Sequence, residues 1–282
     1  MITDTQIETW LREDVGHHDV TNQVPGETTG RLVAKEGGVA AGLDAAAAVF
    51  EYLDVTVTDR VDDGTEIAAG DAVLEVAGPA RDVLRAERVA VNIAGHASGI
   101  ATKTDAAVAA AREGARAGGR DPDDVRVAAT RKTTPGLRGV EKRAVAAAGG
   151  DTHRLDLSHM VMVKDNHVAE MGLEGAVDHF RERVSFATKI EVEVEAVEDA
   201  PRAAAAGADI VLLDNMDPET TERAVELLRE RAADLGREVL AEASGGITVE
   251  TVPDYAATGV DVISMGSLTH SAPTLDYSFQ TG

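Results

Sequence analysis

The chain contains no cysteine, and this absence excludes several kinds of chemistry. Disulfide bonds, thiolate nucleophiles and thiolate metal sites cannot form without that residue. No apolar run approaches the roughly 20 residues that span a bilayer, and the acidic, amphipathic first residues do not resemble a secretory signal. We therefore expect a cytoplasmic protein that does not act in a membrane.

Basic residues are also scarce, with 27 Lys and Arg against 50 Asp and Glu and a net charge of −23. Binding to nucleic acid or to an anionic membrane needs a basic surface, so neither is an expected partner. An acidic surface with few lysines is typical of adaptation to high salt, which screens the repulsion between like charges. Aromatic residues make up only 3%, so the core is expected to consist mainly of Ala, Val, Leu and Ile.

The first 104 residues have the pattern of an α+β sandwich domain. A helix is predicted over 4–14, and short alternating strands follow between Gly and Asp turns. A long helical stretch covers 79–115, and we expect it to break into two helices near Gly95–Gly99.

Residues 105–269 repeat a strand–helix pattern. Short apolar strands are predicted at 125–130, 160–164, 189–195, 209–214, 238–244 and 261–266. Stretches rich in Ala, Glu and Arg lie between them and are predicted to be helical. Such a repeat builds a parallel sheet, either closed as a barrel or open and doubly wound.

The residues that follow the predicted strands favour the barrel. They are Arg131 and Lys132, Lys164, Glu193, Asp214, the 244–246 turn and the 266–267 turn. A barrel gathers all strand ends at one mouth, whereas an open sheet gathers only those near a switch point. We therefore predict an incomplete parallel α/β barrel over 105–269, after an N-terminal α+β sandwich domain over 1–104 on which the tail 270–282 packs.

Positive charge is concentrated between residues 126 and 167, where eight basic residues stand against four acidic ones. Pairing with surface carboxylates is the default explanation for Arg126, Lys142 and Arg143. Four other cations lie at strand ends or in loops, namely Arg131, Lys132, Arg154 and Lys164. Unpaired cations at a barrel mouth are unfavourable without anions, so the ligand is predicted to be polyanionic.

Carboxylates alternate along the strand at 189–195, which places Glu191, Glu193 and Glu195 on one face. We expect Glu191 and Glu195 to be solvated. Glu193 and Asp214 form the expected functional pair, which could hold magnesium or ribose hydroxyls.

Three histidines, His153, His159 and His167, have spacings that fit no helical pair of metal ligands, so zinc is not expected. The chain also lacks GxGxxG and GxxxxGK[ST], which disfavours a nicotinamide cofactor and a Walker ATPase.

Several longer segments carry a family resemblance. They are REDVGHHDVTNQVP (12–25), AERVAVNIAGHASGIAT (86–102), ATRKTTPGLR (129–138) and GGDTHRLDLSHMVMVKDNH (149–167), followed in order by EVEVE, LLDNM, SGGI and MGSLTHS. Over nearly its whole length the chain resembles the quinolinate phosphoribosyltransferases, also called nicotinate-nucleotide pyrophosphorylases (carboxylating). It departs from their pattern with His18 where glycine is usual and Val91 where leucine is usual.

The resemblance implies a pentosyltransferase of NAD biosynthesis. Its substrates would be quinolinate and phosphoribosyl pyrophosphate, and its products nicotinate mononucleotide, pyrophosphate and carbon dioxide, with Mg²⁺ as cofactor. It also implies a homodimer, or a higher oligomer, whose active sites are shared between subunits, with Arg88 supplied by the neighbour.

The family pattern also implies roles for individual residues. Quinolinate would be held by Arg88, Arg131, His153, Arg154 and Lys164, and Thr130 would also bind substrate. The catalytic residues would be Lys132, near the pyrophosphate, and Glu193 and Asp214, which bind the ribose hydroxyls directly or through Mg²⁺. The 5′-phosphate site would be lined by Ser244, Gly245, Gly246, Gly266, Ser267, Leu268 and Thr269, with His270 nearby.

Three alternative hypotheses about the function are also compatible with the fold. A paralogous pyrophosphorylase-like transferase linked to molybdenum transport, or a transferase that takes nicotinate, would share the fold. A non-catalytic binding protein would not need Lys132, Glu193 and Asp214 together. For Arg138 we expect a role in the loop or in a subunit contact rather than in catalysis.

Overall fold

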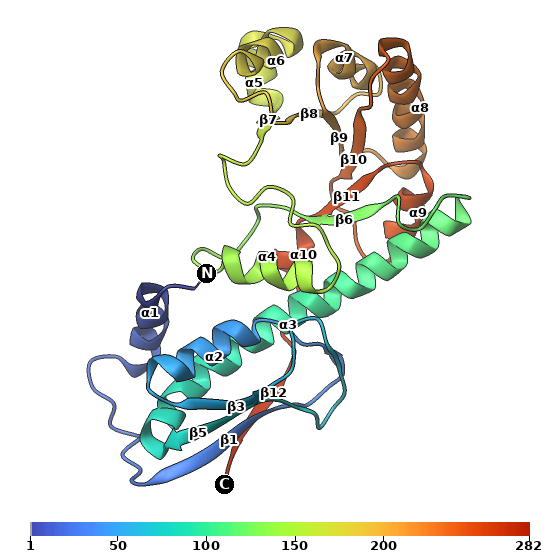
Figure 1. Cartoon of the computed structure of the whole chain (residues 1–282). Helices are drawn as coiled ribbons and strands as arrows, with labels where there is room; N and C mark the ends of the chain where they lie inside the picture. Colours follow the sequence, from blue (N-terminus) through green and yellow to red (C-terminus); the bar gives the residue numbers. More distant parts are fainter. Residues whose placement is uncertain (1) are drawn as a thin grey trace. The chain divides into compact units, whose positions relative to one another are not determined.

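The computed structural model describes residues 2–282, and their contacts divide the chain into two compact units (Figure 1). The first unit combines Met1–Asp105 with Lys132–Gly149 and Leu268–Gly282, and the second combines Ala106–Arg131 with Gly150–Ser267. None of the helices in the described part of the chain has the length and apolar character needed to cross a membrane.

The first unit is built on a four-stranded antiparallel sheet in the order β12-β1-β5-β3. Its strands are β1 (Glu27–Ala34), β3 (Thr56–Arg60), β5 (Ala72–Pro79) and β12 (Tyr277–Thr281). The edge strand β12 comes from the end of the chain and pairs along β1. Helix α2 (Leu43–Tyr52) contacts β3 and β5, and α1 (Asp4–Val15) contacts α2, which confirms the predicted first helix. The remaining elements of this unit are β2 (Gly38–Val39), β4 (Glu66–Ile67), α4 (Arg138–Ala147) and the short α10 (Ser267–His270), whose first residue belongs to the second unit.

Helix α3 (Ala80–Ala117) runs without interruption, so the predicted break near Gly95–Gly99 is wrong. The glycines serve instead to let another backbone come close. A Cβ added to Gly99 would lie 1.9 Å from the Pro273 carbonyl oxygen, and one added to Gly95 would lie 2.8 Å from the Leu275 carbonyl oxygen. Helix propensity alone could not reveal this, because the segment that needs the space is about 175 residues away in the sequence.

The second unit contains a six-stranded sheet in the order β6-β11-β10-β9-β8-β7, in which every pair is parallel. Its strands are β6 (Arg126–Ala129), β7 (Val161–Val163), β8 (Ile190–Val194), β9 (Ile210–Asp214), β10 (Leu240–Ser244) and β11 (Val262–Met265). From β7 to β11 each strand pairs with the next one in the sequence, and β11 then pairs with β6. This is the cyclic order of a barrel with the β6–β7 pairing missing, because a doubly wound sheet would reverse direction at a switch point.

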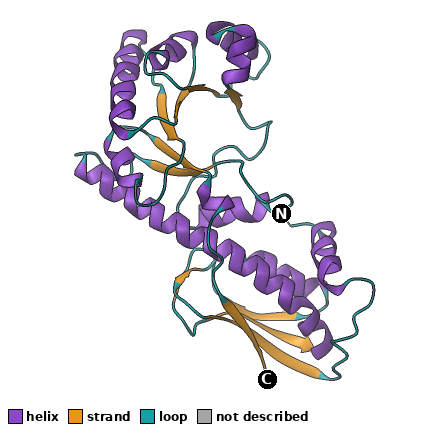
Figure 2. Cartoon of the chain, turned by 180° about the vertical axis from the view of Figure 1, so that it is seen from behind, coloured by secondary structure: helices purple, strands orange, loops and turns teal. Residues whose placement is uncertain are grey.

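Helices pack on the outside of this incomplete barrel (Figure 2). They are α5 (Asp165–Met171), α6 (Leu173–Arg181), α7 (Asp199–Ala206), α8 (Pro218–Leu235) and α9 (Val252–Ala257). Helix α8 begins at Pro218 because the Asp217 carboxylate caps it by accepting a hydrogen bond from the Thr220 N–H at 2.8 Å. The buried strand residues are mostly Ala, Val, Leu and Ile, as the scarcity of aromatic residues predicted.

Candidate active site

The carboxyl ends of the barrel strands bring together many of the predicted site residues of the second unit. Arg131 follows β6, Lys164 follows β7, Glu193 lies on β8, Asp214 ends β9 and Ser244 ends β10. Because all six strands are parallel, these residues lie together at the carboxyl-terminal end of the barrel, where barrel active sites are found.

At the centre of this carboxyl-terminal end lie three charged residues, Lys164, Glu193 and Asp214. The Lys164 ammonium makes an ion pair with the Glu193 carboxylate. Burial, and next the nearby negative charge of Glu193, raises the pKa of Asp214 above its ordinary value. The two carboxylates therefore repel each other across adjacent strands, and a second cation between them would relieve that repulsion. Carboxylate oxygens are the ligands that Mg²⁺ prefers, so this pair fits a magnesium ion.

His153 lies beyond the open edge of the sheet, where Asp151 forms an isolated parallel bridge with Ala128 of β6. Its backbone has a φ of 50°, in the left-handed region that non-glycine residues rarely adopt. The Asp151 carboxylate holds that conformation by accepting a hydrogen bond from the His153 N–H at 2.7 Å. Unusual backbone of this kind often marks a residue whose side chain must be aimed.

The His153 ring is aimed at two buried carboxyl groups. Its Nε2 atom lies 3.1 Å from an oxygen of Glu242 on β10 and 3.6 Å from an oxygen of Glu191 on β8. Glu191 is fully buried and Glu242 is 1% exposed. Burial, reinforced by the charge of Glu242, raises the pKa of Glu191 well above its ordinary value and favours its neutral form.

The expectation that Glu191 faces solvent is therefore wrong, whereas Glu195, at the end of the same run, is exposed. Sequence reasoning also missed Glu242. The available signal was strand alternation, which puts Glu242 on the face of Ser244 in the same way that it puts Glu191 on the face of Glu193. His153, Glu191 and Glu242 each offer an atom within 4.8 Å of the others, a spacing that suits a metal ion. The positive charges of Arg154 and Lys164, however, already oppose the rise in the pKa of Glu191.

Arg154 is 9% exposed, and one of its nitrogens donates to the Met162 sulfur at 3.0 Å. Burial, followed by the positive charge of Arg131, lowers the pKa of Arg154 from its ordinary value. Two guanidinium groups that repel each other in a partly dehydrated place make a strong site for an anion. His159 and His167 have structural partners instead, because each accepts a backbone N–H, from Leu155 and Lys164 respectively.

The predicted glycine-rich turn after β10 meets the end of β9. Gly245 and Gly246 have φ values of 105° and 61°, and a Cβ on Gly245 would lie 2.3 Å from the Asn215 side-chain oxygen. The Asn215 N–H also donates to the Ser244 carbonyl at 2.9 Å. Only glycine allows this close approach, which leaves the backbone of the turn accessible without side chains.

Of the remaining predicted residues, Thr130, Gly266 and Ser267 belong to the second unit, and the others belong to the first unit. Arg88, on α3, is exposed and pairs with Glu87 at 3.3 Å. The Lys132 carbonyl accepts a hydrogen bond from the Thr269 hydroxyl at 2.7 Å, and Leu268 and Thr269 are both buried. His270 is exposed, and its Nδ1 atom lies 2.6 Å from the Ser271 hydroxyl.

Arg138 has a role in the loop that contains it. Its Nε atom donates to the Thr133 hydroxyl at 3.0 Å, which holds the segment after Lys132 against the start of α4. This contact agrees with the expected loop role.

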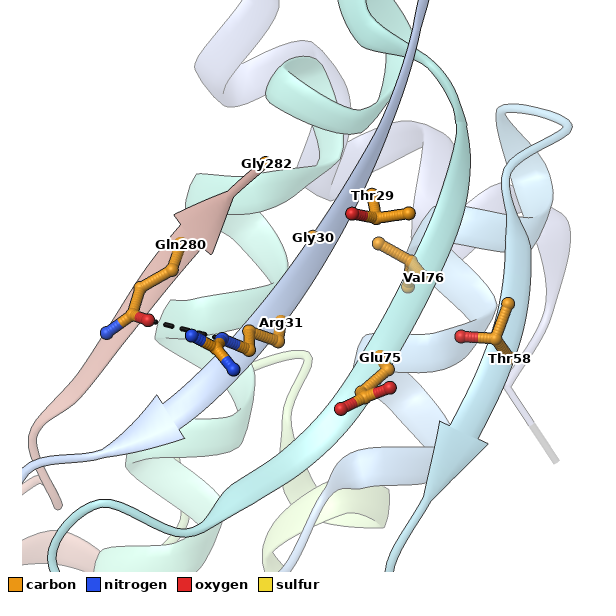
Figure 3. A pocket seen from close by; sticks show the side chains of 8 residues that line it. All are labelled: Thr29, Gly30, Arg31, Thr58, Glu75, Val76, Gln280 and Gly282. Atoms are coloured by element: carbon orange, nitrogen blue, oxygen red, sulfur yellow. Dashed lines mark hydrogen bonds between the residues drawn. The ribbon is translucent and has the colours of Figure 1, made fainter.

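A separate shallow pocket lies on the antiparallel sheet of the first unit and is lined by residues such as Arg31, Glu75 and Gln280 (Figure 3). Arg31 donates to Gln280 across it at 3.2 Å. None of the predicted site residues lines this pocket, so it is not the candidate active site.

The fold and the strand-edge residues together define the class, an α/β-barrel enzyme whose site is built for an anionic ligand. Two family models cover almost the whole chain: "Quinolinate phosphoribosyl transferase, N-terminal domain" matches residues 19–98, and "Quinolinate phosphoribosyl transferase, C-terminal domain" matches residues 100–280. The chain belongs to the quinolinate phosphoribosyltransferase family.

Individual relatives agree with this assignment. A probable nicotinate-nucleotide pyrophosphorylase [carboxylating] from Methanothermobacter thermautotrophicus is 44% identical over 279 residues, covering 97% of each chain. The human nicotinate-nucleotide pyrophosphorylase [carboxylating] is 42% identical, covering 97% of this chain and 90% of the human protein. The crystal structure of NadC from Streptococcus pyogenes has a TM-score of 0.88 and 40% identity, covering 100% of this chain and 98% of that one.

Proposed function

We propose that the protein transfers the phosphoribosyl group of phosphoribosyl pyrophosphate to quinolinate, with loss of carbon dioxide, to make nicotinate mononucleotide for NAD biosynthesis. The observation that carries this proposal is the pair of guanidinium groups of Arg131 and Arg154. The positive charge of Arg131 helps to lower the pKa of the buried Arg154. The family membership supports the same reaction. The molybdenum-linked paralogue and the non-catalytic binder are not favoured by the relatives found.

Quinolinate is a planar ring with two adjacent carboxylates, so its binding requires several cations. Arg131 and Arg154 can each offer two parallel N–H groups to one carboxylate, and Lys164 adds a point charge. His153 can donate from Nδ1 while its Nε2 atom stays at Glu242. Arg88 and Thr130 complete the proposed quinolinate set.

The ribosyl donor requires a different set of groups. Glu193 and Asp214 would bind the ribose hydroxyls, and they are the residues that would hold Mg²⁺. When bound, Mg²⁺ would supply positive charge to neutralise the pyrophosphate. Lys132 would meet the same leaving group, and the 5′-phosphate would be bound by the backbone of Ser244–Gly246 and Gly266–Thr269.

The reaction has two bond-breaking parts. The ring nitrogen attacks C1 of the ribose while the bond from C1 to the pyrophosphate oxygen breaks, and Lys132 stabilises the charge that develops on the leaving oxygen. The bond from C2 of the ring to its carboxylate breaks and releases carbon dioxide. The electron pair remains at C2, where the adjacent cationic nitrogen stabilises it until a proton takes the place of the carboxylate.

We further propose a homodimer or higher oligomer whose subunits share active sites, with Arg88 contributed by the neighbouring subunit, and a cytoplasmic location. The exposure of Arg88 on α3 supports a role outside its own subunit.

The test is a single mixture of purified protein, quinolinate, phosphoribosyl pyrophosphate and Mg²⁺ at high salt, analysed by mass spectrometry. We expect nicotinate mononucleotide and one carbon dioxide per product. Lys132→Ala should be nearly inactive, while Lys35→Ala, which removes an exposed surface lysine, should match the unmodified protein. Product from nicotinate but none from quinolinate would show that the substrate is wrong. Binding of quinolinate without any product would favour the non-catalytic alternative.

A further inference from the structure

The segment from Lys132 to Leu137, called here the Lys132 loop, is held by hydrogen bonds on both sides of Lys132. The Thr269 hydroxyl donates to the Lys132 carbonyl at 2.7 Å. Two residues later, the Thr134 N–H points at the carboxylate of Glu141, with 3.2 Å to each oxygen. The loop then turns at Gly136, which has a φ of 82°.

Glu141 is an unusual partner, because it is fully buried near the start of α4. An ionised carboxylate is unstable in such a place unless it accepts several hydrogen bonds. His96 of α3 supplies one of them, with its Nε2 atom 2.8 Å from Glu141. Burial by itself raises the pKa of Glu141, but the hydrogen bonds from His96 and Thr134 outweigh it and lower that pKa below the ordinary value. Glu141 is therefore charged at neutral pH.

We propose that His96 and Glu141 are positioning residues for Lys132: His96 orients the Glu141 carboxylate, and Glu141 fixes the Lys132 loop through Thr134. The proposal deepens the proposed function, because it rests on the role given to Lys132 there. Neither residue needs to touch a substrate.

The chemistry explains why the loop needs two anchors. Lysine carries a compact charge on a flexible four-carbon stem, so a shift of its backbone moves the whole region that the charge can reach. A displacement of about 1 Å at a catalytic group can lower a rate by about 100-fold. Thr269 fixes the carbonyl side of Lys132, and the pair of His96 and Glu141 fixes the chain two residues on.

A purely structural role, stabilising the first turn of α4, is the competing explanation. A double-mutant cycle separates the two, because a positioning residue loses its effect when the group that it positions is absent. We expect Glu141→Gln to lower kcat by about 10- to 100-fold in the unmodified protein. In a Lys132→Ala background the same change should lower the residual turnover by less than about threefold.

His96 offers a milder variant if Glu141→Gln fails to fold, because its side chain is 26% exposed. His96→Ala should lower kcat, and His96→Gln, whose amide can still donate to Glu141, should restore most of it. Glu226→Gln is the matched control, since Glu226 lies exposed on α8 and pairs only with Arg223 among the described contacts. It should leave kcat unchanged.

Hydrogen exchange at the Thr134 amide gives a readout that does not depend on turnover. The amide should exchange slowly in the unmodified protein and faster in His96→Ala, while exchange within α4 stays the same. The positioning role would be overturned if Glu141→Gln lowered kcat by the same factor with and without Lys132→Ala. It would also be overturned if the folded variants of Glu141 and His96 had an unchanged kcat. If the unmodified protein has no activity with quinolinate, the proposed function fails, and the exchange result alone decides whether His96 and Glu141 hold the loop.

Discussion

Replacing Gly99 by alanine should destabilise the first unit, although alanine is the better helix former. Gly99 lies inside α3, where the segment from Pro273 to Leu275 crosses the helix. The new Cβ would lie 1.9 Å from the Pro273 carbonyl oxygen, while real Cβ contacts essentially never fall below 3.0 Å. The crossing segment must therefore move by at least 3.0 − 1.9 = 1.1 Å.

The size of the effect follows from three contributions. Overpacking of this kind costs about 1–3 kcal/mol. Movement of the segment also strains the hydrogen bond from the Leu275 N–H to the Gly95 carbonyl, which contributes about 1 kcal/mol. The gain in helix propensity offsets about 1 kcal/mol. A net loss of about 1–3 kcal/mol remains, which corresponds to a fall in Tm of roughly 2–12 °C.

Thermal and denaturant unfolding at fixed high salt would measure this loss. The control is Gly175→Ala in α6, where the added Cβ would meet only the Met171 Cβ, at 3.9 Å. That variant should be as stable as the unmodified protein or more stable by about 0.5–1 kcal/mol. If Gly99→Ala were equally stabilising, the close approach of the crossing segment would be refuted.

Two further predictions concern the site and the response to pH. Arg131→Ala should raise the KM for quinolinate by about 10- to 100-fold, which is the value of a charge-assisted hydrogen bond. The KM for the ribosyl donor should change by less than about threefold. Equal changes in both KM values would show that Arg131 does not bind quinolinate. Burial raises the pKa of Tyr277 from 10.0 to about 12, so the folded state keeps a proton that the unfolded state loses, and stability should fall as the pH rises between those values. The loss should reach about 1.4 kcal/mol by pH 11 in denaturant titrations, and Tyr277→Phe should lack this contribution; parallel pH profiles of the two proteins would contradict the assignment.

Much of the second unit could be predicted from local patterns. The apolar runs at β8, β9 and β10 are short and bounded by turns, so their ends, and with them Glu193, Asp214 and Ser244, could be located from the sequence. Parallel strands then place these ends at one edge, whichever residues pack between them. The family motifs extend this prediction to the nature of the substrates.

The errors have a common cause, which is contact between residues far apart in the sequence. Strand alternation places Glu191 on the same face as Glu193. Whether that face is exposed to solvent depends on contacts with Glu242 and His153, which are 89 residues apart in the sequence. The glycines of α3 look like a helix break in the local sequence, because the segment near Pro273 that needs their space lies far along the chain. His96 and Glu141, 45 residues apart, carry no local pattern that connects them.

The sequence by itself determined the strand and helix periodicity, the net negative charge, the absence of thiol chemistry and the family. Each of these depends on residue types and short spacings, which are preserved without any knowledge of packing. Only the tertiary structure decided which carboxyl groups are buried, how His153 is aimed and what holds the Lys132 loop. Burial and hydrogen bonding set the charge of Glu141 and Glu191 in opposite directions, and both effects arise only when distant parts of the chain come together.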